Sequence, residues 1–125
     1  MTCSKCHAGR LKDIPQAHDA VQPAGIERRI VFAPGKFWDD YVARFFTVEK
    51  GAQTPFHTHD WPHYVLIMGG SCDARIDGET YRLEGGCWAH VPSGVEHNFT
   101  NTGDSPLEFV CIVPPKGDPA GTRKA

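Results

Sequence analysis

The chain has 125 residues, a size typical of one domain, and its 13 Lys and Arg against 15 Asp and Glu give a net charge of −2. The basic residues are scattered, which excludes a surface that neutralises a run of phosphates. No apolar run approaches the roughly 20 residues that cross a bilayer, and the polar start lacks the apolar segment of a signal peptide. Five cysteines do not form the even, dense framework of a secreted disulfide protein. We therefore expect a cytoplasmic protein with neither a nucleic-acid nor a membrane partner.

The first 25 residues are polar and show no sustained period, so residues 1–25 are expected to form an N-terminal arm that orders against a partner subunit. Within the arm, Cys3, Cys6 and His7 spell C-x-x-C-H, a haem-attachment pattern. Haem attachment normally follows export, and no export signal precedes the motif. A redox-active pair or an accessory zinc site completed by His18 or by another subunit is an alternative, while two free thiols in a frayed tail are the favoured interpretation.

From Ile26 onward, short segments rich in β-branched and aromatic residues alternate with Gly, Pro, Asn and Asp. The expected strands are IERRIVF, YVARFFTVE, HYVLIMG, CDARID, ETYRLE, CWAHV, HNFTN and LEFVCIV. Between two of them, Asp77 and Gly78 supply the positive φ angles of a two-residue type I′ turn, which predicts a hairpin. Strands that follow one another so closely along the sequence, without a helical period between them, predict an all-β sandwich or barrel.

Three histidines, His57, His59 and His63, fall within seven residues in front of an apolar run, and His97 lies in a second turn-strand segment. Residues two apart on a strand leave the same face, and Pro62 indicates a turn that brings His63 back beside the first pair. Converging neutral imidazoles can bind a divalent transition metal while their other ring nitrogens are held by neighbouring groups. The alternative, ordinary core or surface histidines, would leave several buried imidazoles with unmet hydrogen bonds.

The spacing of these histidines resembles the cupin superfamily. The first motif of that family reads here as Gly51, His57, His59, His63 and Gly70, with His63 where the family normally has glutamate, and the second reads as Gly86, Pro92, Gly94, His97 and Asn101. The resemblance implies a double-stranded β-helix, the jelly-roll barrel, over residues 26–114, with a metal inside one end of the barrel. Residues 115–125 would then form a C-terminal tail.

An all-histidine set leaves the ion its full charge, which makes it a stronger Lewis acid and raises its reduction potential. The chain resembles the small four-histidine manganese cupins, which share its FTVE strand and the Cys in its last strand. The resemblance favours Mn²⁺, and imidazole ligands also suit Fe²⁺, Zn²⁺ and Ni²⁺. Four protein ligands on an octahedral ion leave positions for a small molecule.

Other residues near these motifs are candidates for the site. By alternation Cys111 shares a face with Phe109 and Val113, as core or, as the resemblance implies, as a catalytic lining residue near the metal. Arg44 is expected either to point inward and hold an anionic substrate group or to lie at an exposed rim. An apolar substrate pocket is predicted from Phe56, Trp61, Phe99 and Phe109, with ordinary core packing as the alternative. His90 is expected to be structural.

The preferred functional hypothesis is a metal-dependent oxidoreductase, dioxygenase-like, that uses O2 or a peroxide on a small organic substrate. Because the family glutamate is absent, mechanisms that need it as a general base are disfavoured. The alternatives are a lyase or isomerase that uses the ion as a Lewis acid and a non-catalytic cupin that binds a small ligand. A homodimer is expected, because the edges of a small β-sandwich need cover that the N-terminal arm can supply.

Overall fold

The computed structural model describes residues 7–18 and 22–118 and arranges them almost entirely in strands. The strands are β1 (Ile26–Pro34), β2 (Phe37–Trp38), β3 (Val42–Val48), β4 (His63–Gly69), β5 (Ser71–Ile76), β6 (Glu79–Glu84), β7 (Trp88–Val91), β8 (His97–Asn101) and β9 (Leu107–Val113). Two 3₁₀ turns, η1 (Leu11–Asp13) and η2 (Pro115–Gly117), flank them. All eight predicted strands are confirmed, and β4, β6, β8 and β9 have the predicted bounds. β2 and both 3₁₀ turns were not predicted.

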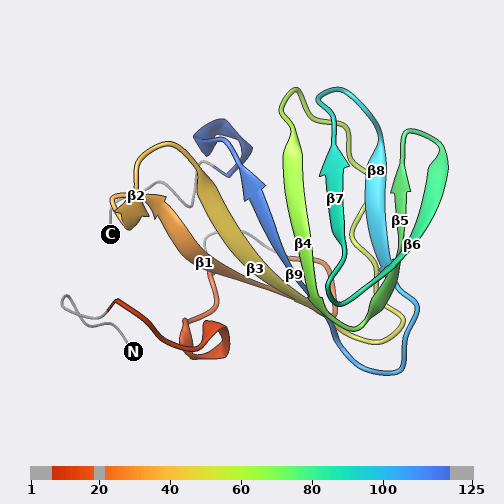
Figure 1. The fold of residues 1–125 in the computed structure, drawn as a ribbon, viewed down its shortest axis with the longest axis horizontal. Coiled ribbons are helices and arrows are strands. Elements are labelled where there is room, and N and C mark those ends of the chain that lie inside the picture. The colour runs from red at the N-terminus through yellow and green to blue at the C-terminus, as the bar shows by residue number, and fades with distance from the viewer. Residues whose placement is uncertain (1–6, 19–21, 119–125) are drawn as a thin grey trace.

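The strands form two sheets that enclose one core (Figure 1). The larger sheet has the order β2-β1-β3-β9-β4-β7, and the smaller has the order β6-β5-β8. Apart from the short parallel β1–β2 pair, all the strand pairs are antiparallel. The all-β jelly-roll prediction is therefore confirmed.

Strand β9 shows how alternation builds the core. Its buried residues are Leu107, Phe109, Cys111 and Val113, each at most 4% exposed. Because β9 lies between β3 and β4, Cys111 pairs with Arg44 on one side and Val65 on the other. Cross-strand partners share a face of the sheet, so these three side chains form one row pointing inward.

The hairpin between β5 and β6 confirms the strongest local turn signal in the sequence. Asp77 has φ 53° and Gly78 has φ 82°, the positive pair that a type I′ turn requires. The register runs from Ile76 opposite Glu79 without a shift. Local turn chemistry is therefore enough to set the pairing of these two strands.

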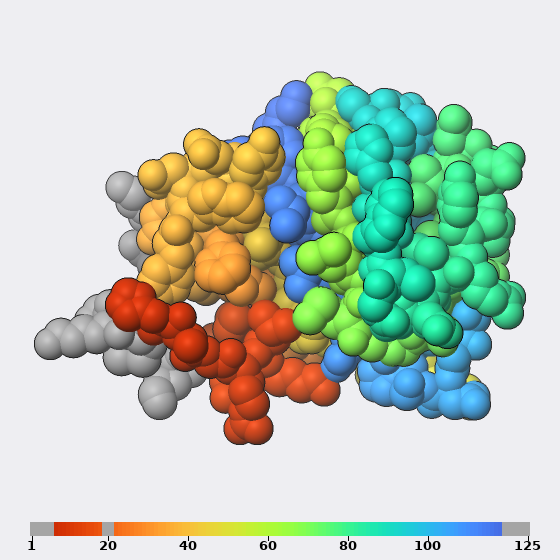
Figure 2. Space-filling view, viewed as in Figure 1, coloured from red at the N-terminus to blue at the C-terminus, as the bar shows by residue number. Residues whose placement is uncertain are grey.

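The described part of the N-terminal arm lies against its own chain, below β1 and β3 (Figure 2). Arg29 Nε donates a hydrogen bond of 2.8 Å to the Ile14 carbonyl, and Lys12 Nζ lies 2.8 Å from Glu108 Oε2. These contacts place residues 11–14 on the larger sheet of the same subunit. Exchange of the arm between subunits stays a prediction.

The C-x-x-C-H motif lies at the edge of what the structure describes. Cys3 and Cys6 fall outside the described residues, and His7 is exposed. The redox, zinc and free-thiol interpretations of this motif therefore stay predictions.

Candidate metal centre

His63 is the first residue of β4 and is 8% exposed. It pairs with Val91 at the start of the β4–β7 ladder, and burial alternates from it along the strand, so its ring points inward. The bend at Asp60-Trp61 precedes it, as the Pro62 signal predicted. The loop therefore ends, and the buried strand begins, at His63.

His97 is the first residue of β8 and is 7% exposed. Its backbone exchanges two hydrogen bonds of 3.0 Å with His57 across an isolated bridge. The carbonyl of His59 accepts a hydrogen bond of 2.7 Å from the Gly94 amide. The two histidine motifs are therefore joined backbone to backbone, which is why segments 40 residues apart converge in one site.

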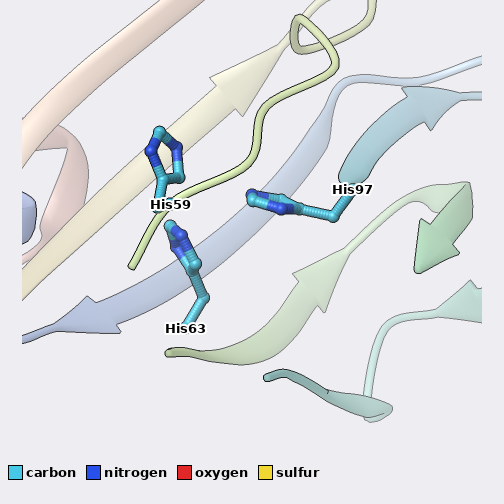
Figure 3. A group of neighbouring side chains, drawn as sticks. All are labelled: His59, His63 and His97. Carbon is cyan, nitrogen blue, oxygen red and sulfur yellow. The ribbon is translucent and has the colours of Figure 1, made fainter. Parts of the chain in front are cut away.

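Three imidazoles meet at this junction. His59, His63 and His97 each offer one ligand nitrogen, and these nitrogens all lie within 4.8 Å of one another. The three rings converge from the loop before β4, the start of β4 and the start of β8 (Figure 3). Ring centroids of His63 and His97 are 4.6 Å apart, and those of His59 and His63 are 5.3 Å apart.

Hydrogen bonds on the far side of two rings leave the inner nitrogens available. His97 Nδ1 lies 3.2 Å from the Val95 carbonyl; that oxygen only accepts, so the proton sits on Nδ1 and Nε2 keeps its lone pair. His63 Nδ1 lies 3.4 Å from Cys111 Sγ, while its buried Nε2 has no partner among the described residues. A metal ion satisfies a buried nitrogen of this kind, and a held second nitrogen is the usual arrangement for a histidine ligand.

The surroundings of His59, His63 and His97 favour the neutral form of each imidazole. Burial, followed by the charges of His97 and Arg44, lowers the pKa of His63 to about 3. Burial also lowers the pKa of His59 and of His97. Neutral imidazole is the metal-binding form, so the donor set fits a divalent transition metal at neutral pH.

The lowered pKa of His63 predicts the pH dependence of the metal-free protein. The unfolded chain takes up a proton near pH 6.5, whereas folded His63 resists protonation until about pH 3. Acid therefore favours unfolding, and this contribution to stability is complete above pH 6.5 and lost progressively below it. We expect a slope of up to about 1.4 kcal/mol per pH unit from this site, measured by urea unfolding of metal-free protein. A His63→Gln variant should show a shallower slope, and an equal slope would contradict the assignment.

His57, the fourth predicted ligand, lies beside the group rather than in it. Its ring centroid is 5.0 Å from that of His59, but its nitrogens are not among the three that converge. The side chain is exposed, and residues 58–62 are coil. The same-face argument for the H-x-H pair assumed a strand that does not form here, and coordination by His57 stays a prediction.

Cys111 and Arg44 lie behind His63. Arg44 Nη2 donates a hydrogen bond of 3.1 Å to Cys111 Sγ, and the thiol in turn contacts His63 Nδ1 rather than Nε2. Arg44 is 9% exposed, and its Nη1 lies 3.4 Å from Asp118 Oδ2. These contacts place both residues behind the His63 ring, and the catalytic roles predicted for them stay predictions.

Sequence reasoning missed the ion pair that completes this network. Arg28 donates to Asp118 through Nε at 2.9 Å and Nη2 at 2.8 Å. Alternation along β1 could have predicted that Arg28 points inward, because Ile26 and Ile30 lie on the same face of the strand. Nothing periodic marks Asp118, which follows the last strand in a polar segment.

The predicted pocket aromatics are found in three different environments. Trp61 stacks on His59 with centroids 4.6 Å apart and an angle of 9°. Phe99 and Phe109 stack on each other at 5.3 Å within the core. Phe56 is 49% exposed and lies against Arg75, 6.0 Å from the guanidinium carbon. Trp61 is the one of these four with a ring contact to a histidine of the group.

Asn101, from the second motif, and His90 both make structural contacts. Asn101 Nδ2 donates to the Val48 carbonyl at 2.9 Å and to the Ser105 carbonyl at 3.0 Å, closing the loop before β9. His90, expected to be structural, stacks on Tyr64 at 5.4 Å on the outer face of the larger sheet. Neither side chain belongs to the converging group.

Comparison with known proteins identifies the family of this chain. The Cupin domain family matches residues 44–113, more than half of the chain, so the chain belongs to the cupin family. It is 35% identical over 51 residues to quercetin 2,3-dioxygenase of Bacillus subtilis strain 168, which is 40% of this chain and 15% of that protein. It is 33% identical over 72 residues to oxalate decarboxylase OxdC of the same organism, which is 53% of this chain and 19% of that protein.

Solved structures show the same fold. The polyketide cyclase RemF from Streptomyces resistomycificus superposes with a TM-score of 0.75 at 21% identity, covering 87% of this chain and 79% of that one. The chain spans less than one fifth of the two Bacillus relatives. Over the described residues, the helices are too short to cross a membrane.

Proposed function

We propose that this cupin is a metal-dependent oxidoreductase, dioxygenase-like, that acts on a small organic substrate. The observation that carries the proposal is the buried Nε2 of His63, which has no partner among the described residues and lies within 4.8 Å of the ligand nitrogens of His59 and His97. Mn²⁺ is the favoured ion, with Fe²⁺, Zn²⁺ or Ni²⁺ as alternatives. His57 is proposed as a fourth ligand, since its ring centroid lies 5.0 Å from that of His59 and its backbone is hydrogen-bonded to His97.

The chain's own residues would hold and orient the reactants. A divalent transition metal would supply Lewis acidity and, for Mn or Fe, one-electron redox chemistry. His59, His63 and His97 would bind it, while Cys111 and the Val95 carbonyl fix two of the rings. The buried guanidinium of Arg44 adds positive charge beside the centre, which favours a substrate that carries a carboxylate or another anionic group.

A lyase that uses the ion as a Lewis acid is the second candidate. Two observations favour it: the similarity to oxalate decarboxylase over 53% of the chain and the buried positive charge of Arg44 beside the histidines. Neither candidate uses a carboxylate at the position of His63. The two differ in whether turnover consumes oxygen.

The test begins with elemental analysis of protein purified without a nickel column. The metal-loaded protein is then given quercetin and, separately, oxalate, while dissolved oxygen and product are followed. Net oxygen consumption in step with quercetin loss, absent in a His63→Ala variant, supports the oxidoreductase. Oxalate breakdown with release of CO2 and no net oxygen consumption supports the lyase. Metal binding with neither reaction favours the non-catalytic alternative.

We also propose a homodimer. The outward side chains of β4 and β7 include Tyr64, Leu66, Met68 and Trp88, which are 45%, 50%, 52% and 71% exposed. Strands β4 and β7 lie side by side on the face shown in Figure 2, and Leu66 is directly opposite Trp88; exposed apolar side chains gathered on one face mark an interaction surface. Light scattering that gives the mass of one chain would contradict the proposal.

A further inference from the structure

The segment after the last strand is short, polar in composition and yet partly buried. Pro115–Gly117 form the 3₁₀ turn η2, and Asp118 follows it with 6% exposure. Figure 1 shows this turn at the end of the larger sheet where β9 ends and β4 begins. We call residues 114–118 the C-terminal turn.

A buried carboxylate is stable only when it is paired and hydrogen bonded. Asp118 meets this condition through Arg28, which binds both of its oxygens at 2.9 Å and 2.8 Å. The two residues are 90 positions apart in the sequence. The planar fork of arginine matches a carboxylate in two bonds and fixes its orientation, so the C-terminal turn is anchored to β1.

From Asp118 a line of contacts reaches the metal centre. Asp118 Oδ2 lies 3.4 Å from Arg44 Nη1, Arg44 Nη2 lies 3.1 Å from Cys111 Sγ, and Cys111 Sγ lies 3.4 Å from His63 Nδ1. The single carboxylate thus contacts two buried guanidiniums, neutralises one of their two positive charges and holds the guanidinium that touches the thiol. Without that charge, Arg44 would be drawn toward water and would release the support behind His63.

A second line of contacts reaches His59. Trp61 stacks on His59 and packs against the core, and its indole lies close to the backbone of Gly117. A Cβ atom added at Gly117 would lie 2.7 Å from Trp61 Nε1 and 2.8 Å from Val113 Cβ. The backbone of the C-terminal turn therefore approaches the indole more closely than any side chain would permit.

We propose that the C-terminal turn positions the metal ligands, with Asp118 acting on His63 through Arg44 and Cys111, and Gly117 acting on His59 through Trp61. Asp118 and Gly117 are positioning residues, because each acts on a histidine through another side chain. The inference rests on the proposed metal centre and goes beyond it, because it assigns the geometry of that centre to a segment outside both histidine motifs.

The test uses Co²⁺ alone as the probe, with the metal-free protein of 125 residues. Dissociation constants come from competition with a chelator, and ligand geometry comes from the visible absorption bands of bound Co²⁺. We expect Asp118→Asn and Gly117→Ala each to weaken binding by about 10-fold to 100-fold, as loss of outer-shell partners does, and to shift the Co²⁺ bands. Lys116→Ala is the matched control: it lies in the same turn but outside both lines of contacts, and its exposed pair with Asp60 at 3.7 Å contributes little, so its affinity and spectrum should stay close to those of the wild type.

Urea unfolding of each metal-free variant separates positioning from folding. If Asp118→Asn does not fold, Gly117→Ala and Trp61→Leu test the second line of contacts alone. Wild-type affinity and wild-type bands in every folded variant would overturn the positioning role and leave the metal centre intact. A wild-type protein that binds no Co²⁺ and no Mn²⁺ would instead overturn the proposed function, and the positioning role with it.

Discussion

Replacing His63 by alanine is expected to weaken metal binding by more than about 100-fold, beyond the usual effect of losing an outer-shell partner. His63 is among the most buried of the histidines, its Nε2 has no partner among the described residues, and its pKa of about 3 keeps it neutral. No other described side chain joins the converging group to replace it. Chelator competition with Mn²⁺ measures the effect.

The control for this substitution is His90→Ala. His90 lies on the outer face of the larger sheet, where it stacks on Tyr64, so its loss should leave metal affinity unchanged. His57→Ala is the informative intermediate: a large loss would support a fourth ligand, and a loss under about threefold would limit the set to three. Equal affinity of His63→Ala and wild type, with both folded by urea unfolding, would refute the assigned metal centre.

The strands were predictable because their signals are local. β9 alternates buried and half-buried residues over its whole length, and Asp77-Gly78 set one turn by backbone preference alone. The converging histidines were predictable for a different reason: each motif ends in a strand that begins on a histidine, His63 and His97, and the family resemblance supplied their pairing in space.

The rest depends on contacts that sequence patterns do not carry. Phe37 adopts φ 72°, which a bulky residue rarely does, to enter a two-residue parallel pairing with β1. Phe56 lies in coil, where alternation assigns no face, and it is found over Arg75. Asp118 pairs with Arg28 across 90 residues, and nothing in a polar tail distinguishes one buried carboxylate from its exposed neighbours.

The closing glycine of the first histidine motif, Gly70, is expected to be far less tolerant of substitution than its conformation alone implies. Its φ is +81°, and an added Cβ would lie 2.6 Å from the Pro106 carbonyl oxygen and 2.9 Å from Leu107 Cα. Both are backbone atoms, so neither can rotate aside. Leu107 is fully buried and begins β9, the strand that carries Cys111 behind His63. Strain at Gly70 therefore passes into the strand that holds Cys111 against the His63 ring.

Gly35→Ala provides the matched comparison, because Gly35 has φ +83° and nothing within 4 Å of an added Cβ. Both substitutions incur about 1–2 kcal/mol for a left-handed backbone with a side chain. Gly70→Ala adds about 1–3 kcal/mol of overpacking, so we expect a total loss of about 2–5 kcal/mol in the free energy of unfolding. Urea unfolding of the metal-free proteins measures both. Equal losses in the two variants would mean that β9 shifts to accommodate the new methyl group. Glycine would then be required at position 70 for its positive φ angle and not for the close approach of β9.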